Sequence, residues 1–263
     1  KHQPLVDIGF GPHAPYTVSD KPLETIRTLA EQLNIPIQIH LHETEFEVLD
    51  AVDKTGKRPS QRLFDLGLLG PDVQAVHVTQ VDESDIALFK ESNTTVIHCP
   101  ESNLKLASGF CPVHKLQEAG INVALGTDGS ASNNDLDMIG EMRTAALIAK
   151  AVAQDASALP ALEAVKMATI NGAKAMGKEN EIGSIKAGKQ ADLISIDFND
   201  IASNPIYDPI SHLVYTATRN QVDHVWVAGK LQLKDKQLCH LNEAQLIELA
   251  QSWADKIQAS NQA

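Results

Sequence analysis

The segment QIHLHETEFE, residues 38–47, places two histidines two positions apart and a glutamate directly after the second. In a β-strand alternate side chains share a face, so Gln38, His40 and His42 are expected to point the same way. An imidazole at a strand end can hold a metal ion, and the carboxylate of Glu43 can then reach a water molecule on that metal. Zinc lowers the pKa of such water to about 7, and a carboxylate can relay its proton. The spacing of His40 and Glu43 is therefore suited to metal-dependent hydrolysis.

Short apolar runs rich in β-branched residues recur along the chain and predict strands. They are LVDIGFG (5–11), IPIQIHLH (35–42), VQAVHVT (73–79), TTVIHCP (94–100) and INVALGTDG (121–129). Helix-like stretches separate them, such as DKPLETIRTLAEQLN (20–34), in which the apolar residues recur at helical spacing. Strands that alternate with helices predict repeated βα units, and therefore an α/β fold with a parallel sheet.

Each predicted strand carries polar residues at or just beyond its carboxyl end. These residues are His13, His40, His42, Glu43, His77, His98 and Asp128. The active sites of parallel α/β folds, and above all of (β/α)8 barrels, lie at this edge of the sheet. One such histidine alone is more often a structural residue than a ligand, but several at one edge favour a functional site.

Each of these residues also has a structural interpretation. His13, in GPHAPYT, is equally suited to a hydrogen bond within a proline-rich turn and to substrate contact. His98 and Cys99 could form a nucleophilic pair, but no third orienting group is evident, which favours structural or pocket-wall roles. Glu43 could be a first-turn carboxylate favoured by the helix dipole, and that role is compatible with chemistry. Asp128 could cap the next helix, but the asparagines that follow it are better placed to do so, which favours a ligand role.

The character of the sequence changes after residue 180. The segments IGSIKAGKQADLISIDF (182–198) and VDHVWVAGKLQL (222–233) combine β-forming residues with turn glycines, and they predict strands of a small β-sandwich. The segment NEAQLIELAQSWADKIQ (242–258) predicts a final amphipathic helix.

Composition limits the partners and the compartment. The 263 residues carry a formal net charge of −12, so the basic footprint of a nucleic-acid-binding protein is missing. The three cysteines have no paired spacing, which favours a reducing compartment over a disulfide framework. No apolar run approaches the ~18 residues of a membrane span, and no signal peptide is visible. We therefore expect a cytoplasmic protein with neither nucleic acid nor membrane as a partner.

Four segments together carry a specific resemblance: GPHAPYTVSD (11–20), HLHETEFEV (40–48), HCPESNLKLASG (98–109) and LGTDGSASNNDLDMIGEMRTAAL (125–147). They resemble the amidohydrolase superfamily, and within it the branch of methylthioadenosine/S-adenosylhomocysteine deaminases and the related triazine chlorohydrolases. IGSIKAGKQADLISID also resembles the β-sandwich segment that follows the barrel in those enzymes. The resemblance implies a (β/α)8 metal-dependent hydrolase barrel with a small β-sandwich domain, in which the strands seen here are the fourth to the eighth.

The resemblance also implies roles for individual residues. His40 would be a metal ligand, Glu43 the acid and base that shuttles protons, and His77 the residue that orients the attacking water. Asp128 would be both metal ligand and base. His13 would contact the ribose or base of the substrate, which Glu43 and Asp128 would also touch.

Two further features of the site follow from the same resemblance. The SNLKLASG segment, residues 102–109, would line the pocket. The role of His42 stays open between a pocket wall and a residue that supports a ligand.

One departure from the family pattern is large. The family supplies two more metal ligands from a His-x-His pair on its first barrel strand, whereas the only such pair here is HLH at 40–42. We therefore expect the C-terminal portion of a longer protein, with barrel in residues 1–180, a β-sandwich segment in 181–238 and a C-terminal helix in 239–263. With His40 and Asp128 as its only ligands, this portion alone is expected to bind metal poorly.

The implied function is a metal-dependent hydrolytic deaminase of adenosine-type nucleosides (5′-methylthioadenosine, S-adenosylhomocysteine or adenosine) that releases ammonia and an inosine-type product. The expected cofactor is one zinc ion per subunit, although iron or manganese also suits histidine and aspartate ligands. A homodimer is expected.

The alternatives are a deaminase or chlorohydrolase of another N-heterocycle, such as guanine or a triazine, and a non-catalytic barrel scaffold. The presence of Glu43, His77 and Asp128 beside His40 argues against the scaffold.

Overall fold

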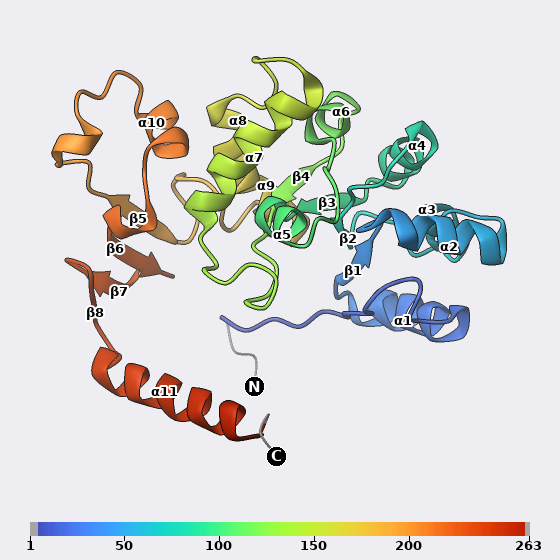
Figure 1. Cartoon of the computed structure of the whole chain (residues 1–263), viewed down its shortest axis with the longest axis horizontal. Coiled ribbons are helices and arrows are strands. Elements are labelled where there is room, and N and C mark those ends of the chain that lie inside the picture. The colour runs from blue at the N-terminus through green and yellow to red at the C-terminus, as the bar shows by residue number, and fades with distance from the viewer. Residues whose placement is uncertain (1–4, 261–263) are drawn as a thin grey trace.

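The computed structural model describes residues 5–260 (Figure 1). Its central feature is a parallel sheet of four strands, which lie in the order of the chain. They are β1 (Ile37–Leu41), β2 (Val73–His77), β3 (Thr95–His98) and β4 (Val123–Leu125). The predicted α/β organisation is present, with a helix or helices after every strand. The helices of this region are α1 (Asp20–Leu33), α2 (Glu45–Thr55), α3 (Pro59–Asp65), α4 (Glu83–Ser92), α5 (Pro100–Lys105), α6 (Val113–Glu118), α7 (Met138–Ala153), α8 (Ala161–Met167) and α9 (Ile170–Ala175).

The strand predicted over 5–11 is almost absent. Only Phe10 pairs with the sheet, through an isolated parallel bridge to Ile37. The chain nevertheless runs along β1, because the N–H of Gln38 donates to the Phe10 carbonyl at 2.9 Å and that of His40 to the His13 carbonyl at 3.1 Å. Glycine weakens a strand interior, and Phe10 lies between two glycines, which explains why the pairing does not extend into a strand.

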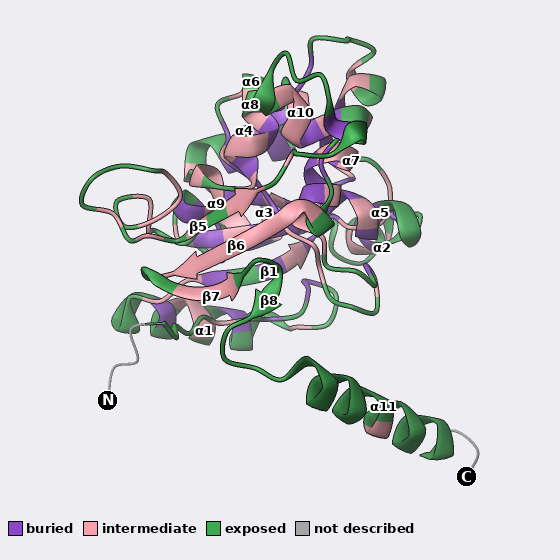
Figure 2. Ribbon diagram, turned by 90° about the vertical axis from the view of Figure 1, so that its left-hand side faces the viewer, coloured by how far each residue is buried: buried purple, intermediate pink, exposed green. Residues whose placement is uncertain are grey.

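The two faces of β1 lie in different surroundings. Ile37, Ile39 and Leu41 are buried, whereas Gln38 on the opposite face is exposed and His40 is half-buried. In Figure 2 the buried residues gather around the parallel sheet and α7. The strand alternation predicted for Gln38 and His40 is therefore present, and it leaves His40 accessible from the open face.

Helix α7 begins later than the sequence pattern indicates. Its N-cap is Asp137, whose side chain accepts the N–H of Ile139 at 2.9 Å. The expected caps were the asparagines that follow Asp128, Asn133 or Asn134; Asn133 is buried instead, and its amide donates to the carboxylate of Glu141 at 2.5 Å. That carboxylate also accepts the N–H of Glu101, and it joins the loop after β4 to the start of α5.

Burial gives Glu141 a measurable pH signature. Desolvation raises its pKa to about 8 from an ordinary value of 4.5, so the folded protein holds this proton where the unfolded chain releases it. The stabilising effect of protonated Glu141 is fully present below pH 4.5 and is lost as the pH rises toward about 8. We expect the free energy of unfolding of Glu141→Gln, relative to that of the wild type, to rise from pH 5 to 8, because only the wild type loses the stabilising effect of this proton. Urea denaturation of both proteins across that range checks this, and a constant difference would contradict it.

A second, antiparallel sheet follows the helices. Its strands lie in the order β5 (Leu193–Ile196), β6 (Val222–Val227), β7 (Lys230–Lys234) and β8 (Gln237–Leu238). Between β5 and β6 come the short 3-10 turns η1 (Ile201–Ser203) and η2 (Arg219–Gln221) and helix α10 (Pro209–Tyr215). α10 packs against α7 and α8, and so joins this part to the helices of the parallel sheet. The described residues thus form one antiparallel sheet at this end of the chain, where strands of a small β-sandwich were expected, and the sandwich itself stays a prediction.

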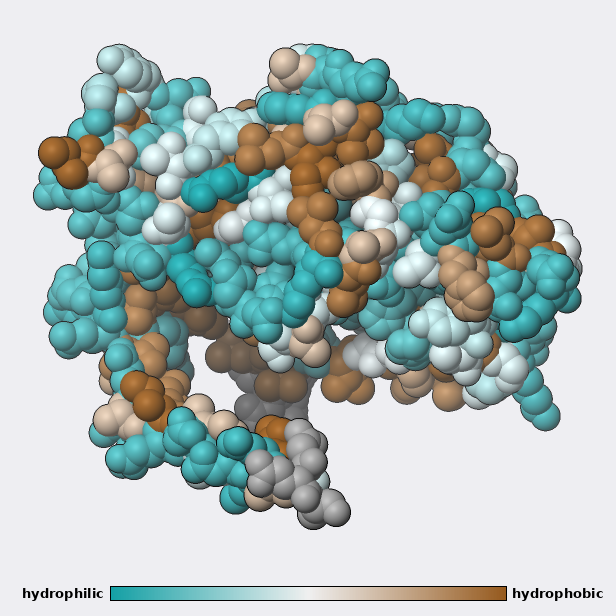
Figure 3. Space-filling model, viewed as in Figure 1, coloured by the Kyte–Doolittle hydropathy of each residue, from teal (hydrophilic) through white to brown (hydrophobic). Residues whose placement is uncertain are grey.

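The predicted final helix is α11 (Glu243–Ser260), which projects from the rest of the structure (Figures 1 and 2). None of its residues is buried within the described structure, and its exposed apolar residues include Leu246, Leu249 and Trp253. Figure 3 shows apolar and hydrophilic side chains side by side along it, as expected for an amphipathic helix. Neither α11 nor any other helix among the described residues is long and apolar enough to cross a membrane.

Candidate active site

The carboxyl edge of the parallel sheet brings most of the predicted site residues together. The ring centroids of His13 and His40 lie 5.2 Å apart, and those of His40 and His77 lie 5.4 Å apart with the rings stacked. Oε2 of Glu43 lies 3.7 Å from Nε2 of His77. Asp128 also lies near His77, because the adjacent residues Ser102 and Asn103 form hydrogen bonds to Asp128 and to His77, respectively. Both acidic side chains are therefore near His77, at one end of the row formed by His13, His40 and His77.

The position of His77 departs from strand alternation. Its Cα pairs with that of Leu41, so a regular strand would place the two side chains on the same face, away from His40. The backbone of His77 has a φ of 77°, in the left-handed region that a residue with a side chain rarely adopts. This conformation reorients the side chain, and the ring stacks on His40 instead. Such backbone strain is concentrated at functional sites.

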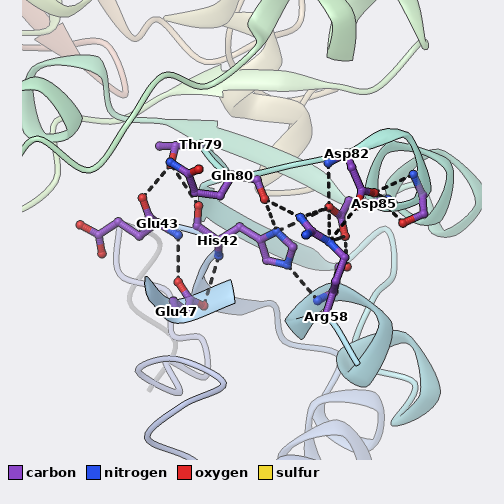
Figure 4. Close-up of polar contacts among 10 residues, drawn as sticks. His42, Glu43, Glu47, Arg58, Thr79, Gln80, Asp82 and Asp85 are labelled. Atoms are coloured by element: carbon purple, nitrogen blue, oxygen red, sulfur yellow. Dashed lines mark hydrogen bonds and ion pairs between the residues drawn. The ribbon is translucent and has the colours of Figure 1, made fainter. Parts of the chain in front are cut away.

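His42 is reoriented in the opposite sense. It was expected on the face of His40, but its φ is 55° and its side chain is fully buried. In Figure 4 the ring points away from Glu43 and toward Arg58 and Asp85. Its Nδ1 donates to the Gln80 carbonyl at 2.8 Å, and its Nε2 accepts the N–H of Ser60 at 3.0 Å. Both ring nitrogens are used, and burial lowers the pKa of His42, so this residue is neither a pocket wall nor free to bind a metal.

A buried ion pair supports His42. The guanidinium of Arg58 donates to Asp85 at 2.6 Å and to the Gln80 carbonyl at 2.7 Å, and Ser60 also bonds to Asp85. Only 26% of the Arg58 side chain and 1% of the Asp85 side chain are exposed. This pair thus joins β1, α3 and α4 directly behind the site.

Removal of Arg58 should destabilise the fold strongly. Arg58→Met leaves the Asp85 carboxylate buried without its cation, and breaking such a pair costs about 3 kcal/mol or more. The matched control is Lys115→Met, which removes one partner of an exposed ion pair with Glu83 and should change the stability little. Denaturant unfolding of the two variants measures the difference, and equal losses of stability would contradict the prediction.

Hydrogen bonds position both the backbone and the carboxylate of Glu43. Its backbone N–H and that of His42 donate to the carboxylate of Glu47, at 2.9 and 3.2 Å (Figure 4). Its own carboxylate accepts a hydrogen bond from Ser108 at 3.1 Å. Thr44 caps α2 by accepting the N–H of Glu47 at 3.3 Å. Sequence analysis missed Glu47, although the Thr-x-x-Glu spacing of a capping box was a signal for it.

Asp128 lies beyond β4 in a left-handed conformation with a φ of 63°. Its Oδ2 accepts hydrogen bonds from Ser102 at 2.7 Å and Ser132 at 2.6 Å, and its Oδ1 accepts the N–H of Gly129 at 2.7 Å. Burial acts to raise the pKa of Asp128, but these three hydrogen bonds outweigh it and hold the pKa below its ordinary value. The carboxylate is therefore charged, as a metal ligand or a base requires.

The donor atoms fit a metal ion in type. Nδ1 of His40 donates a hydrogen bond to the His13 carbonyl at 2.6 Å, so that nitrogen carries the proton and Nε2 has a free lone pair. Imidazole nitrogen and carboxylate oxygen are ordinary zinc donors. Within residues 5–260, however, there is no group of three His, Cys, Asp or Glu side chains placed to hold a metal ion. His40 and Asp128 are thus suited to be part of a ligand set.

The other two histidine predictions have different outcomes. Nδ1 of His13 bonds to Thr17 at 2.8 Å, so the turn interaction is present, while substrate contact stays a prediction. His98 is buried, its Nδ1 has no hydrogen-bond partner, and burial lowers its pKa to about 3. Burial also raises the pKa of the Cys99 thiol, which argues against a nucleophilic pair.

Residues 1–232 match the model of the amidohydrolase family. The 5-methylthioadenosine/S-adenosylhomocysteine deaminase of Saccharophagus degradans is 57% identical over 97% of this chain and 57% of its own length. The 5′-deoxyadenosine deaminase of Methanopyrus kandleri is 42% identical over 97% of this chain and 59% of its own length. The chain thus spans a little over half of these relatives.

Solved structures show the same fold. A crystal structure of an adenosine deaminase from Xanthomonas campestris with bound zinc superposes with a TM-score of 0.96 at 50% identity, over 98% of this chain and 58% of that one. An atrazine chlorohydrolase from Arthrobacter aurescens, complexed with zinc and atraton, has a TM-score of 0.90 at 22% identity, over 95% of this chain and 56% of that one. At that identity the second likeness concerns the fold alone.

Proposed function

We propose, since this chain belongs to the amidohydrolase family, that it is the C-terminal portion of a metal-dependent hydrolytic deaminase of adenosine-type nucleosides. The observation that carries the proposal is that both acidic side chains lie close to His77, which itself stacks on His40. Glu43 lies 3.7 Å from the His77 ring, and the adjacent residues Ser102 and Asn103 bond to Asp128 and His77. The relatives named as deaminases are 42–57% identical, which favours nucleoside deamination over triazine chemistry.

The metal ion is assigned to His40 and Asp128, with one zinc ion per subunit as the first choice and iron or manganese as compatible replacements. When bound, zinc acidifies a water molecule and makes it a nucleophile near neutral pH. The remaining ligands are assigned to parts of the whole protein outside this chain. This division is consistent with the absence of a three-residue set within residues 5–260 and with the partial coverage of the relatives.

The residues of this chain then move the protons. Asp128 accepts a proton from the attacking water, which His77 orients through Nε2. Glu43 delivers a proton to N1 of the purine as the water oxygen attacks C6. Asp128 then passes its proton to the amino nitrogen, the bond between C6 and that nitrogen breaks, and ammonia leaves. Glu43 recovers a proton from the C6 hydroxyl, and an inosine-type nucleoside remains. His13 holds the ribose or base from the open side of the row.

The proposal extends to the organisation of the protein. Residues 1–180 are assigned to the (β/α)8 barrel, with β1–β4 as its strands five to eight and the chain at Phe10 in the place of the fourth. Residues 181–238 are assigned to a small β-sandwich and residues 239–263 to the segment of the terminal helix; residues 1–4 and 261–263 lie outside the described part of the chain. The sheet β5–β8 is one layer of that sandwich. The enzyme is a cytoplasmic homodimer that binds a nucleoside and neither nucleic acid nor membrane. The buried, unpaired thiols of Cys99 and Cys111 support a reducing compartment.

A substrate panel tests the proposal. Ammonia release by the complete, zinc-loaded protein is measured with methylthioadenosine, S-adenosylhomocysteine, adenosine, guanine and a chlorinated triazine. We expect kcat/KM for at least one adenosine-type nucleoside to exceed that for guanine and triazine by about 10²-fold or more, because the pocket contacts discriminate in the transition state. A preference for guanine or triazine would replace the proposed substrate class. A protein without bound metal and without turnover would favour a scaffold.

A further inference from the structure

One short segment contacts three of the proposed catalytic groups. Ser102 donates to Oδ2 of Asp128 at 2.7 Å, and Oδ1 of Asn103 bonds to Nδ1 of His77 at 2.8 Å. Ser108 donates to Oε1 of Glu43 at 3.1 Å. The three groups come from different parts of the fold: the end of β2, the connection between β1 and α2, and the loop after β4. Residues 102–108 therefore connect side chains that are far apart in the sequence.

The segment itself is held rigidly. Ser102, Asn103 and Ser108 are 0%, 2% and 5% exposed, although they lie on a one-turn helix and the loop that follows it. The Ser108 carbonyl accepts the side-chain amide of Gln80 at 3.0 Å and the hydroxyl of Thr79 at 3.3 Å. Those two residues are shown in Figure 4 beside Glu43.

Gly109 makes this close approach feasible. Its φ is 135°, and a Cβ atom on it would lie 2.3 Å from Nε2 of Gln80 and 2.9 Å from Oγ1 of Thr79. A side chain at this position would therefore displace Gln80 or Thr79, the two side chains that donate to the Ser108 carbonyl.

The contact of Asn103 also selects a form of the His77 ring. A carboxamide oxygen only accepts hydrogen bonds, so Nδ1 of His77 carries the proton. In a neutral ring the lone pair is then on Nε2, which faces Glu43 at 3.7 Å. This tautomer is the one that can accept a hydrogen bond from a water molecule between His77 and the acidic groups.

We propose that residues 102–108 form a positioning clamp, in which Ser102, Asn103 and Ser108 set the orientations of Asp128, His77 and Glu43, and Asn103 holds His77 as the Nδ1–H tautomer. The catalytic part of this inference rests on the proposed deaminase function. Its structural part, the tautomer, does not. The clamp residues touch the proton-transferring groups and act through them, so they are positioning residues.

The first test reads the tautomer without any turnover. The whole protein is labelled with ¹⁵N-histidine, the His77 signals are identified by their loss in His77→Gln, and long-range ¹H–¹⁵N spectra show which ring nitrogen is protonated. We expect a protonated Nδ1 in the wild type and in Asn103→Asp, because a carboxylate also accepts this bond. Asn103→Ala should populate the other tautomer. A wild type with a protonated Nε2 and a bare Nδ1, or an Asn103→Ala ring unchanged from the wild type, would overturn the assignment.

The second test is kinetic and covers the two serines. Ser102→Ala and Ser108→Ala should each lower kcat about 10- to 100-fold with KM nearly unchanged, as loss of residues that orient catalytic groups does. Ser203→Ala is the matched control, since Ser203 is also buried and hydrogen-bonded but lies in η1, outside the site. Equal kcat values for all three variants would refute the clamp. If the wild type deaminates no nucleoside, the proposed function fails, while the tautomer test still decides the role of Asn103.

Discussion

Replacing Glu43 with glutamine is expected to lower kcat of the complete enzyme by about 10³-fold while the bound metal content stays at the wild-type level. Glutamine has nearly the same shape and can still accept the hydrogen bond from Ser108, so the fold around it is preserved. It cannot donate a proton to N1 of the purine. The loss should therefore appear in catalysis and in neither folding nor metal binding.

The control for this variant is Glu45→Gln. Glu45 is the first residue of α2 and is exposed, so the change removes the same charge from the same helix end without touching the site. Its kcat should match that of the wild type. Turnover measured by ammonia release, with metal counted by elemental analysis, separates the outcomes. A Glu43→Gln enzyme with near-normal turnover would remove Glu43 from the proton transfer.

Replacing Asp128 with asparagine should have an effect at least as large, because one change removes both a metal ligand charge and a base. The substituted side chain fits its surroundings. Its oxygen can keep the bond from the Gly129 N–H, and its amide can donate to the hydroxyls of Ser102 and Ser132, which rotate to accept. The variant thus retains the geometry of the loop and loses the negative charge.

We expect Asp128→Asn to lose about 10³-fold or more in kcat and to bind metal more weakly, since metal ligands must carry their deprotonated, charged form. Asp135→Asn, on the same loop and exposed, is the control and should retain both properties. Metal affinity is measured by competition with a chelator, and turnover at saturating zinc. If Asp128→Asn binds metal as tightly as the wild type but has no turnover, Asp128 is a base only. Full activity would exclude both roles.

The two faces of β1 show where pattern reasoning is reliable. The apolar and polar residues from Ile37 to His40 alternate with the period of a strand, and the structure buries one set and leaves the other accessible. Sequence also predicted the parallel sheet, because short β-branched runs separated by helical stretches have few other arrangements. These features depend on local periodicity, which a single sequence displays.

The strand ends show where such reasoning fails. Strand alternation places His42 beside His40 and gives no reason for His77 to lie there. In the structure His42 points away from His40, and His77 stacks on His40. The cause is a left-handed backbone at each residue, with φ values of 55° and 77°. Histidine pays a steric penalty in that region, and only surrounding contacts such as those of His42 with Ser60 and Gln80 maintain it. No sequence pattern predicts this left-handed backbone conformation.

The sequence alone determined which residue types are available for chemistry, that βα units place them at one edge of a parallel sheet, and that His40 lies on its accessible face. The tertiary structure decided which of them meet. In the tertiary structure the His42 side chain points toward the helices, and the His77 ring stacks on that of His40. The tertiary structure also placed residues 102–108 against Asp128, His77 and Glu43. These decisions depend on backbone conformation and on contacts between residues 26 to 65 positions apart, which local periodicity does not encode.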